Sequence, residues 1–247
     1  EGPDAALPWI EQAQAADPEW FWPHLDASRA LLDLGRVEEA RAEASLAIPR
    51  IGPDDDDGWS VAAAVLMDLG ELAEAAAILG RLVERDPDDA DDWYVLGLAR
   101  HELGDADGAA DAWLRARALD LEAPRPAWRL THAELEAIAE RTLAELPDLV
   151  VARLADVPIF VEEVPSEDEV RDGLDPRVLG VFSGTPLPHK EGGSVPGLDH
   201  ATLFLRNLEM ACADRAELEE QVRITIFHET AHFFGLEDDD LDAIGLG

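Results

Sequence analysis

Two histidines and a glutamate near the carboxyl end of the chain have the spacing of a zinc site. His228, Glu229 and His232 lie within the segment TIFHETAHFFGLEDDDLD, residues 225–242. On a helix, residues four apart lie about 40° from each other around the axis, so both imidazoles can face one metal ion. In this H-E-x-x-H arrangement the histidines bind zinc, and the glutamate polarises a water on the metal. The spacing predicts zinc-dependent hydrolysis with Glu229 as the catalytic base.

A third ligand is expected just after the helix. A catalytic zinc normally takes three protein ligands and one water, so two histidines leave the site incomplete. Gly235 can leave the helix in a left-handed conformation and turn the chain back under the metal. Asp238, ten residues after His228, is then placed to donate a carboxylate oxygen. Asp239 and Asp240 are alternative ligands in the same acidic run. A catalytically inactive metal site, or surface histidines on an acidic helix, are the other interpretations of the motif.

The residues around this motif predict a small α+β unit. Thr131 and Glu134 form a capping-box pair that begins a helix at about 131–145, and Pro147 marks its end. A long helix is expected at 214–235, with Asp214 as its N-cap and Gly235 at its end. Between these helices, the pattern predicts strands within 156–164, 179–188 and 201–207 and a capped helical turn at 166–173.

The segment ATLFLRN, residues 201–207, is a candidate substrate-binding edge. An extended peptide would add a strand to it, as in other peptide-binding sheets. The alternative is that Leu203 and Leu205 pack in the core. For the oxyanion of the reaction, the candidate donors are His189, His200 and Arg206, each with a loop or surface role as the alternative.

The first part of the chain repeats with a period of 34 residues. Matched residues are Trp59/Trp93, Gly70/Gly104 and Ala75/Ala109, with Gly35 in a looser copy 35 residues before Gly70. The segments GPDDDDG and RDPDDADD between copies stop one helix and cap the next. Each helix pair leaves an apolar face that the next pair covers, so we expect a stacked helical array with its tryptophans in the core.

These repeats resemble tetratricopeptide repeats. The residues that carry the resemblance are the leading Trp59 and Trp93, the pair Leu96-Gly97, Ala75, Ala109 and the closing Pro87. The resemblance implies an all-α array whose concave groove binds a protein or peptide partner. For a short array, a purely structural or docking role is the alternative.

Charge and cysteine content exclude several classes of partner. The chain has 55 acidic and 19 basic residues, a net charge of −36. Such a surface repels nucleic-acid phosphates and anionic lipid headgroups, so we expect neither a nucleic acid nor a membrane as partner. The single cysteine, Cys212, cannot form an internal disulfide, which fits a cytoplasmic protein.

Residues from about 140 to 246 resemble the zincin-like metallopeptidase family of bacteria, also called minimal metalloproteases. Four blocks carry the resemblance in order: LADVPIFVEEVPSED, LGVFSGTPLP, ATLFLRNLE and VRITIFHETAHFFGLEDDDLDAIG. The resemblance implies zinc on His228, His232 and Asp238, with Glu229 as the base. That family commonly has tyrosine where this chain has Phe182.

The order H-E-x-x-H-x-x-G-x-x-D also resembles the metzincin pattern, with aspartate in place of the third histidine. Metzincins have a methionine turn after the motif. In this chain both methionines, Met67 and Met210, precede the motif, so the floor of the site must be built differently.

The expected fold is α+β overall, with tetratricopeptide-like helical repeats in residues 1–128 and a small α+β zincin-like domain in residues 129–247. The expected function is zinc-dependent hydrolysis of peptide bonds in a protein or peptide substrate. The alternative is a repeat-based protein–protein adaptor with a structural or inactive zinc site.

Overall fold

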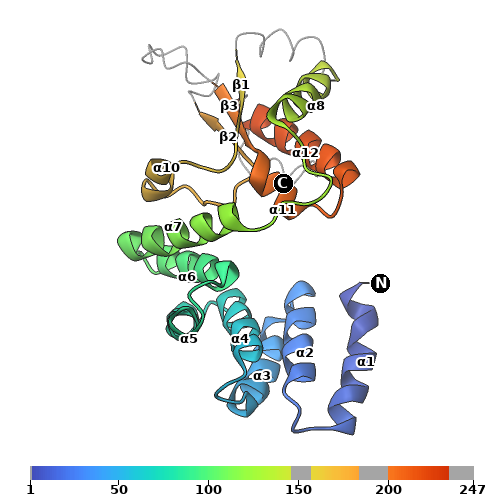
Figure 1. The fold of residues 1–247 in the computed structure, drawn as a ribbon. Coiled ribbons are helices and arrows are strands. Elements are labelled where there is room, and N and C mark those ends of the chain that lie inside the picture. The colour runs from blue at the N-terminus through green and yellow to red at the C-terminus, as the bar shows by residue number, and fades with distance from the viewer. Residues whose placement is uncertain (1, 146–156, 184–199, 234–247) are drawn as a thin grey trace, which may run out of the picture. The chain divides into compact units, whose positions relative to one another are not determined.

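The computed structural model describes residues 2–145, 157–183 and 200–233 (Figure 1). Over these residues the chain forms two compact units. Unit 1 comprises Glu1–Asp120 and Arg171–Gly173, and unit 2 comprises Leu121–Val170 and Leu174–Gly247. The expected fold class is confirmed, because unit 1 is helical and unit 2 combines helices with a small sheet. The expected boundary between residues 128 and 129 stays a prediction.

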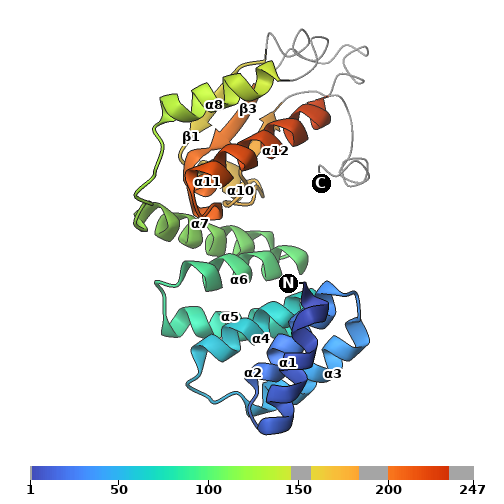
Figure 2. The same ribbon diagram turned by 90° about the vertical axis from the view of Figure 1, so that its right-hand side faces the viewer.

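Unit 1 is a series of helices in which neighbours along the chain pack against each other (Figures 1 and 2). In chain order they are α1 (Pro3–Ala16), α2 (Trp22–Asp33), α3 (Val37–Ala47), the 3-10 turn η1 (Ile48–Arg50), α4 (Asp56–Asp68), α5 (Leu72–Arg85), α6 (Ala90–Glu102) and α7 (Ala106–Glu122).

The same glycine turn recurs in each helix pair, which explains the period of about 34 residues in the sequence. Gly35, Gly70 and Gly104 have φ angles of 70°, 77° and 78°, and they lie between α2 and α3, α4 and α5, and α6 and α7. This left-handed conformation is strained for residues with a Cβ and costs glycine little. The glycine spacing in the sequence therefore marks the turn inside each helix pair.

The two leading tryptophans of the repeats lie partly in the core, as expected. Trp59 and Trp93 pack against the buried cluster that α4, α5 and α6 share. Each indole nitrogen also donates to a carbonyl oxygen in the preceding turn, Trp59 to Gly52 at 2.9 Å and Trp93 to Pro87 at 3.0 Å. The ring thus fixes the start of its helix to the turn before it.

The expectation that the tryptophans pack in the core is wrong for two of them. Trp9 is 70% exposed and Trp20 is 48% exposed. Trp9 lies on α1, a helix that buries none of its residues, and Trp20 lies in the connection between α1 and α2. Neither position has a second helix pair stacked over it as Trp59 and Trp93 do.

Unit 2 places short strands among helices. Its elements are α8 (His132–Ala144), β1 (Ile159–Glu162), α10 (Glu167–Arg171), β2 (Gly180–Ser183), β3 (His200–Phe204), α11 (Leu205–Ala211) and α12 (Arg215–Phe233). The predicted capping box is present: Glu134 N donates to Thr131 Oγ1 at 3.3 Å, and Thr131 N donates to Glu134 Oε2 at 2.9 Å. Within residues 2–145, 157–183 and 200–233, no helix is both long and apolar enough to cross a bilayer.

The sheet overturns the expectation for residues 201–207. Its strand order is β1-β3-β2, with β1 parallel and β2 antiparallel to β3, so β3 is the central strand and not an edge. The strand also ends at Phe204, because the chain enters α11 at Leu205. Leu203 and Leu205 are 1% and 0% exposed, which confirms core packing for this segment. A short, fully apolar run does not show from its periodicity where a strand gives way to a helix.

The core of unit 2 joins its two longest helices to the sheet. Leu135 and Ile138 of α8 lie in one buried cluster with Val222 and Ile226 of α12 and Leu203 of β3. Burial of an aliphatic side chain contributes about 1.5–3 kcal/mol, so this cluster is the main force that holds α12 in place.

Candidate metal centre

The helix α12 carries the H-E-x-x-H motif without interruption. Its start is capped as expected: Asp214 Oδ1 accepts from the backbone N–H of Ala216 at 2.9 Å and of Glu217 at 3.0 Å. The helix then runs to Phe233, so positions 228 and 232 lie one turn apart on one face of a regular helix. The backbone confirms the prediction that the two histidine positions lie four residues apart on a helix.

A close contact with the strand β2 fixes the orientation of α12 near the motif. A Cβ added to Gly180 of β2 would lie 2.7 Å from Cγ2 of Thr225 on α12, nearer than real Cβ atoms come. Thr225 itself is 7% exposed, and its hydroxyl donates to the carbonyl of Gln221 at 2.9 Å. Glycine at position 180 therefore lets the strand and the helix approach closely.

The motif lies on the flank of α12 next to β2. Thr225, which touches Gly180, lies three positions before His228, so the two differ by about 60° around the helix axis. Ile226, which points into the core, lies about 160° from His228. His228 is half-buried. The helix α12 packs against β2, and both elements are labelled in Figure 1.

The strand β2 is an edge strand within the described part of the sheet. It pairs with β3 through the register Gly180 with Leu203 to Ser183 with His200, and no other described strand lies beside it. The sheet edge that contacts α12 is therefore β2. The segment predicted from the sequence as the substrate-binding edge, residues 201–207, begins with the neighbouring strand β3.

Part of the predicted site lies outside the described residues. The side chains of Glu229 and His232 and the whole of Gly235 and Asp238 are not among them, and the alternative ligands Asp239 and Asp240 are not either. Among the side chains that are described, no three histidine, cysteine or acidic residues gather as a metal site. The ligand set His228, His232 and Asp238, with Glu229 as base, stays a prediction.

The candidate oxyanion donors have different positions. Arg206 is 2% exposed in α11, and its Nη2 donates to the carbonyl of Ala123 at 2.5 Å, so its guanidinium belongs to the interior of unit 2 and not to a loop or surface. His200 begins β3, and its ring lies edge-on to Phe160, with 5.4 Å between centroids. His189 lies outside the described residues.

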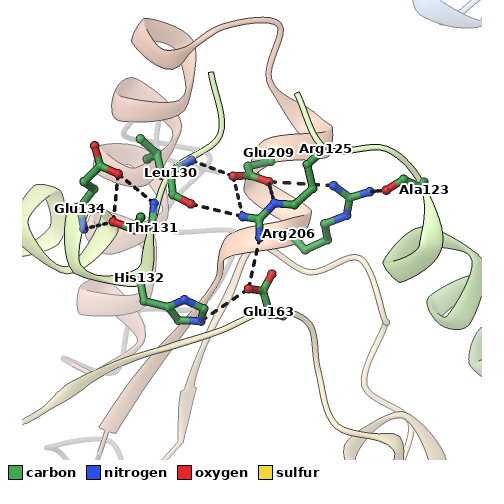
Figure 3. Close-up of polar contacts among 9 residues, drawn as sticks. All are labelled: Ala123, Arg125, Leu130, Thr131, His132, Glu134, Glu163, Arg206 and Glu209. Carbon is green, nitrogen blue, oxygen red and sulfur yellow. Dashed lines mark hydrogen bonds and ion pairs between the residues drawn. The ribbon is translucent and has the colours of Figure 1, made fainter. Parts of the chain in front are cut away.

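An ion cluster that the sequence did not suggest joins Arg125 to the buried carboxylate of Glu209 on α11 (Figure 3). Arg125 donates from Nε and Nη2 to the two carboxylate oxygens of Glu209, both at 2.8 Å. Its Nη1 reaches Glu163 at 3.4 Å, and the backbone N–H of Leu130 donates to Glu209 at 2.9 Å. The hydrogen bond to Glu209 raises the pKa of Arg125 above its usual value, against the effect of burial. Arg125 and Glu209 are 84 residues apart, so no local pattern pairs them.

Two family matches agree with the two parts of the chain. Residues 154–247 match the Zincin-like metallopeptidase family, and residues 61–123 match the Tetratricopeptide repeat family. Both resemblances seen in the sequence are thereby confirmed. No curated protein matches the chain.

Solved helical-repeat structures resemble this chain only distantly. MamA 41-end from Desulfovibrio magneticus RS-1 is 20% identical with a TM-score of 0.43, over 62% of this chain and 80% of that one. A thermophilic TPR protein of Thermus thermophilus is 24% identical with a TM-score of 0.41, over 62% and 78%. YrrB, described as a TPR protein with an unusual peptide-binding site, is 18% identical with a TM-score of 0.41, over 57% and 66%.

Proposed function

We propose that this chain, whose residues 154–247 match the zincin-like metallopeptidase family, is a zinc-dependent peptidase with helical repeats that dock a partner or substrate. The observation that supports the proposal best is the unbroken course of α12 through the H-E-x-x-H motif, beside the edge strand β2.

The donor set fits zinc. Two imidazoles one helical turn apart suit the metal, and a carboxylate from Asp238 would complete three protein ligands with one position left for water. When bound, zinc would polarise the scissile carbonyl and lower the pKa of the attacking water. The same donor types with a fourth protein ligand would give a closed, structural site.

The proton is handled by Glu229 in this proposal. The residue is adjacent to His228 in the sequence and on the same helix, so it can accept the proton of the attacking water without being a metal ligand. It then passes the proton to the amine that leaves. A carboxylate suits this task because it is a base at neutral pH.

The substrate lies along β2 in this proposal, in place of the expected segment 201–207. An extended peptide adds to an exposed sheet edge through backbone hydrogen bonds, which are independent of side-chain sequence. Two features support β2: its position at the edge of the described sheet, and its contact with α12 through Gly180 and Thr225.

The experiment measures bound zinc and the cleavage of a denatured protein for three forms of the full chain. These are wild type, Glu229→Gln and, as a control, Glu220→Gln, which removes an exposed carboxylate from the same helix. We expect all three to hold one zinc, and only Glu229→Gln to lose cleavage, by about 100-fold or more. Zinc without cleavage in any form would refute the peptidase and favour the adaptor with a structural or inactive site.

A further inference from the structure

Unit 1 has a shallow groove between α1 and α2, two helices that lie side by side in Figure 1. Its volume is about 480 Å³. The apolar part of its lining comes from Pro3, Ala6 and Ile10 of α1 and from Ala30 of α2. Because α1 buries none of its residues, its three groups face the groove and solvent more than a core, whereas Ala30 of α2 is buried. The groove can therefore take small apolar side chains of another polypeptide.

The polar lining of the groove is acidic on balance. Asp26 and Asp33 lie two turns apart on the face of α2 that lines the groove, with Arg29 between them. All three side chains are exposed. Neither carboxylate forms an ion pair with a described residue, so both are open to a cation from a partner.

The acidic position at Asp33 recurs along the repeats. Asp33, Asp68 and Glu102 are the last residues of α2, α4 and α6, and each lies two residues before the left-handed glycine of its turn. All three are exposed, and none forms an ion pair with a residue in the described part of the chain. A negative charge at a helix C-terminus opposes the helix dipole, so helix stability does not explain the recurrence.

We propose that the groove and this acidic row bind a basic, extended segment of a partner protein. Apolar residues of the segment would lie between α1 and α2, and its lysines or arginines would pair with the groove carboxylates and with the helix ends that follow. Asp33 belongs to both features, which joins the groove to the row.

The spacing of the row sets the spacing of the basic residues. The helices α2 and α4 pack against each other, as do α4 and α6. Axes of packed helices lie about 8–10 Å apart. Three residues of an extended chain in the polyproline II conformation span about 9 Å, and every third side chain points to the same face. A basic residue at every third position therefore matches one carboxylate per repeat.

This inference rests on the docking role proposed for the repeats and not on the metal chemistry. Its test uses the full-length Glu229→Gln variant, so that the probe is not cleaved. The probe is a fluorescein-labelled peptide of four Lys-Ala-Leu triplets, and the comparison peptide has glutamate in place of lysine. Binding is measured by fluorescence anisotropy at low and at high salt.

The matched variants remove equal charge from two places. Asp26→Asn with Asp33→Asn removes two carboxylates from the groove, and Asp107→Asn with Asp111→Asn removes two exposed carboxylates from α7. We expect the groove pair to weaken binding of the lysine peptide by about fivefold to thirtyfold, and the α7 pair by less than about twofold. Ala6→Tyr, which fills the apolar part of the groove, should weaken binding while leaving every charge in place.

Three results would overturn the proposal. The first is an absence of saturable binding of the lysine peptide. The second is equal weakening by both pairs of substitutions, which would show attraction to net charge alone. The third is unchanged affinity in Ala6→Tyr with intact helical circular dichroism, which would mean that the groove is not occupied. Each of these results leaves the zinc and cleavage measurements unaffected.

Discussion

Replacing Arg125 by glutamine should loosen α11, the helix that precedes α12. Arg125 makes two hydrogen bonds of 2.8 Å to Glu209, whose side chain is 0% exposed. Glutamine keeps much of the side-chain length and removes the positive charge. Glu209 would then be a buried carboxylate that has lost its closest cation.

The size of the effect follows from what stays near Glu209. Removing one partner of a buried ion pair costs about 3–5 kcal/mol. The cost here should be near the lower end, because the side chain of Arg125 is 29% exposed and solvent screens its charge. In addition, Leu130 still donates its N–H to Glu209 at 2.9 Å, and Arg206 Nη1 lies 4.0 Å from it. About 3 kcal/mol corresponds to a change of about 150-fold in an opening equilibrium.

Hydrogen exchange followed by mass spectrometry measures this change locally, which suits a chain with two compact units that need not unfold as one. Exchange in the peptide 205–226 should speed up by about 150-fold in Arg125→Gln. In the control Arg129→Gln it should stay within about twofold, because no described side-chain interaction of Arg129 is lost. The double variant Arg125→Gln with Glu209→Gln should recover part of the loss, since it removes the unpaired charge. Equal exchange in Arg125→Gln and Arg129→Gln would refute the assigned role of the ion pair.

Four further substitutions test the packing, a buried charge and a helix cap. Gly97→Ala should destabilise unit 1 by about 1–3 kcal/mol, because the new Cβ would lie 2.1 Å from Cδ1 of Trp113. Gly80→Ala, whose new Cβ would have no atom within 4 Å, should stabilise unit 1 by about 0.5–1 kcal/mol. Urea unfolding measures the change in unfolding free energy for both variants, and changes of the same sign would contradict the packing. Burial raises the pKa of Asp92, so the ionised carboxylate destabilises the folded state above that pKa, and Asp92→Asn should increase the unfolding free energy there. The increase should fade as pH falls through the pKa of Asp92. An increase that grows toward acid pH would contradict this reasoning. Thr131→Ala should cost about 1 kcal/mol at the start of α8, seen as faster exchange in 132–144, and unchanged protection there would mean that the capping box contributes nothing.

The sequence predicted the parts of the fold that depend on neighbouring residues. The turns at Gly35, Gly70 and Gly104 need a left-handed residue, and their spacing is visible in the sequence. The start of α8 depends on Thr131 and its third neighbour Glu134, which is a local pattern too.

The parts that depend on distant residues were missed. Nothing near Leu205 shows that the chain turns into a helix there, because Leu203 and Leu205 are apolar in either conformation. The central place of β3 depends on its pairing with both β1 and β2, and the role of Arg125 depends on Glu209, 84 residues away.

In the candidate site too, the sequence predicted what depends on neighbouring residues and missed what depends on distant ones. The spacing of His228 and His232 follows from the helix, whose backbone is described through both positions. The edge strand beside them was misassigned, because the approach of β2 depends on Gly180 and Thr225, which are 45 residues apart.

X-ray absorption at the zinc edge on the purified full chain tests the proposed site most directly. We expect one zinc per chain with two imidazole nitrogens at about 2.0–2.1 Å, and oxygen ligands from one carboxylate and one water. The variant His228→Ala should lose the metal. Purified chain without stoichiometric zinc, or zinc closed by four protein ligands, would contradict the proposed peptidase site.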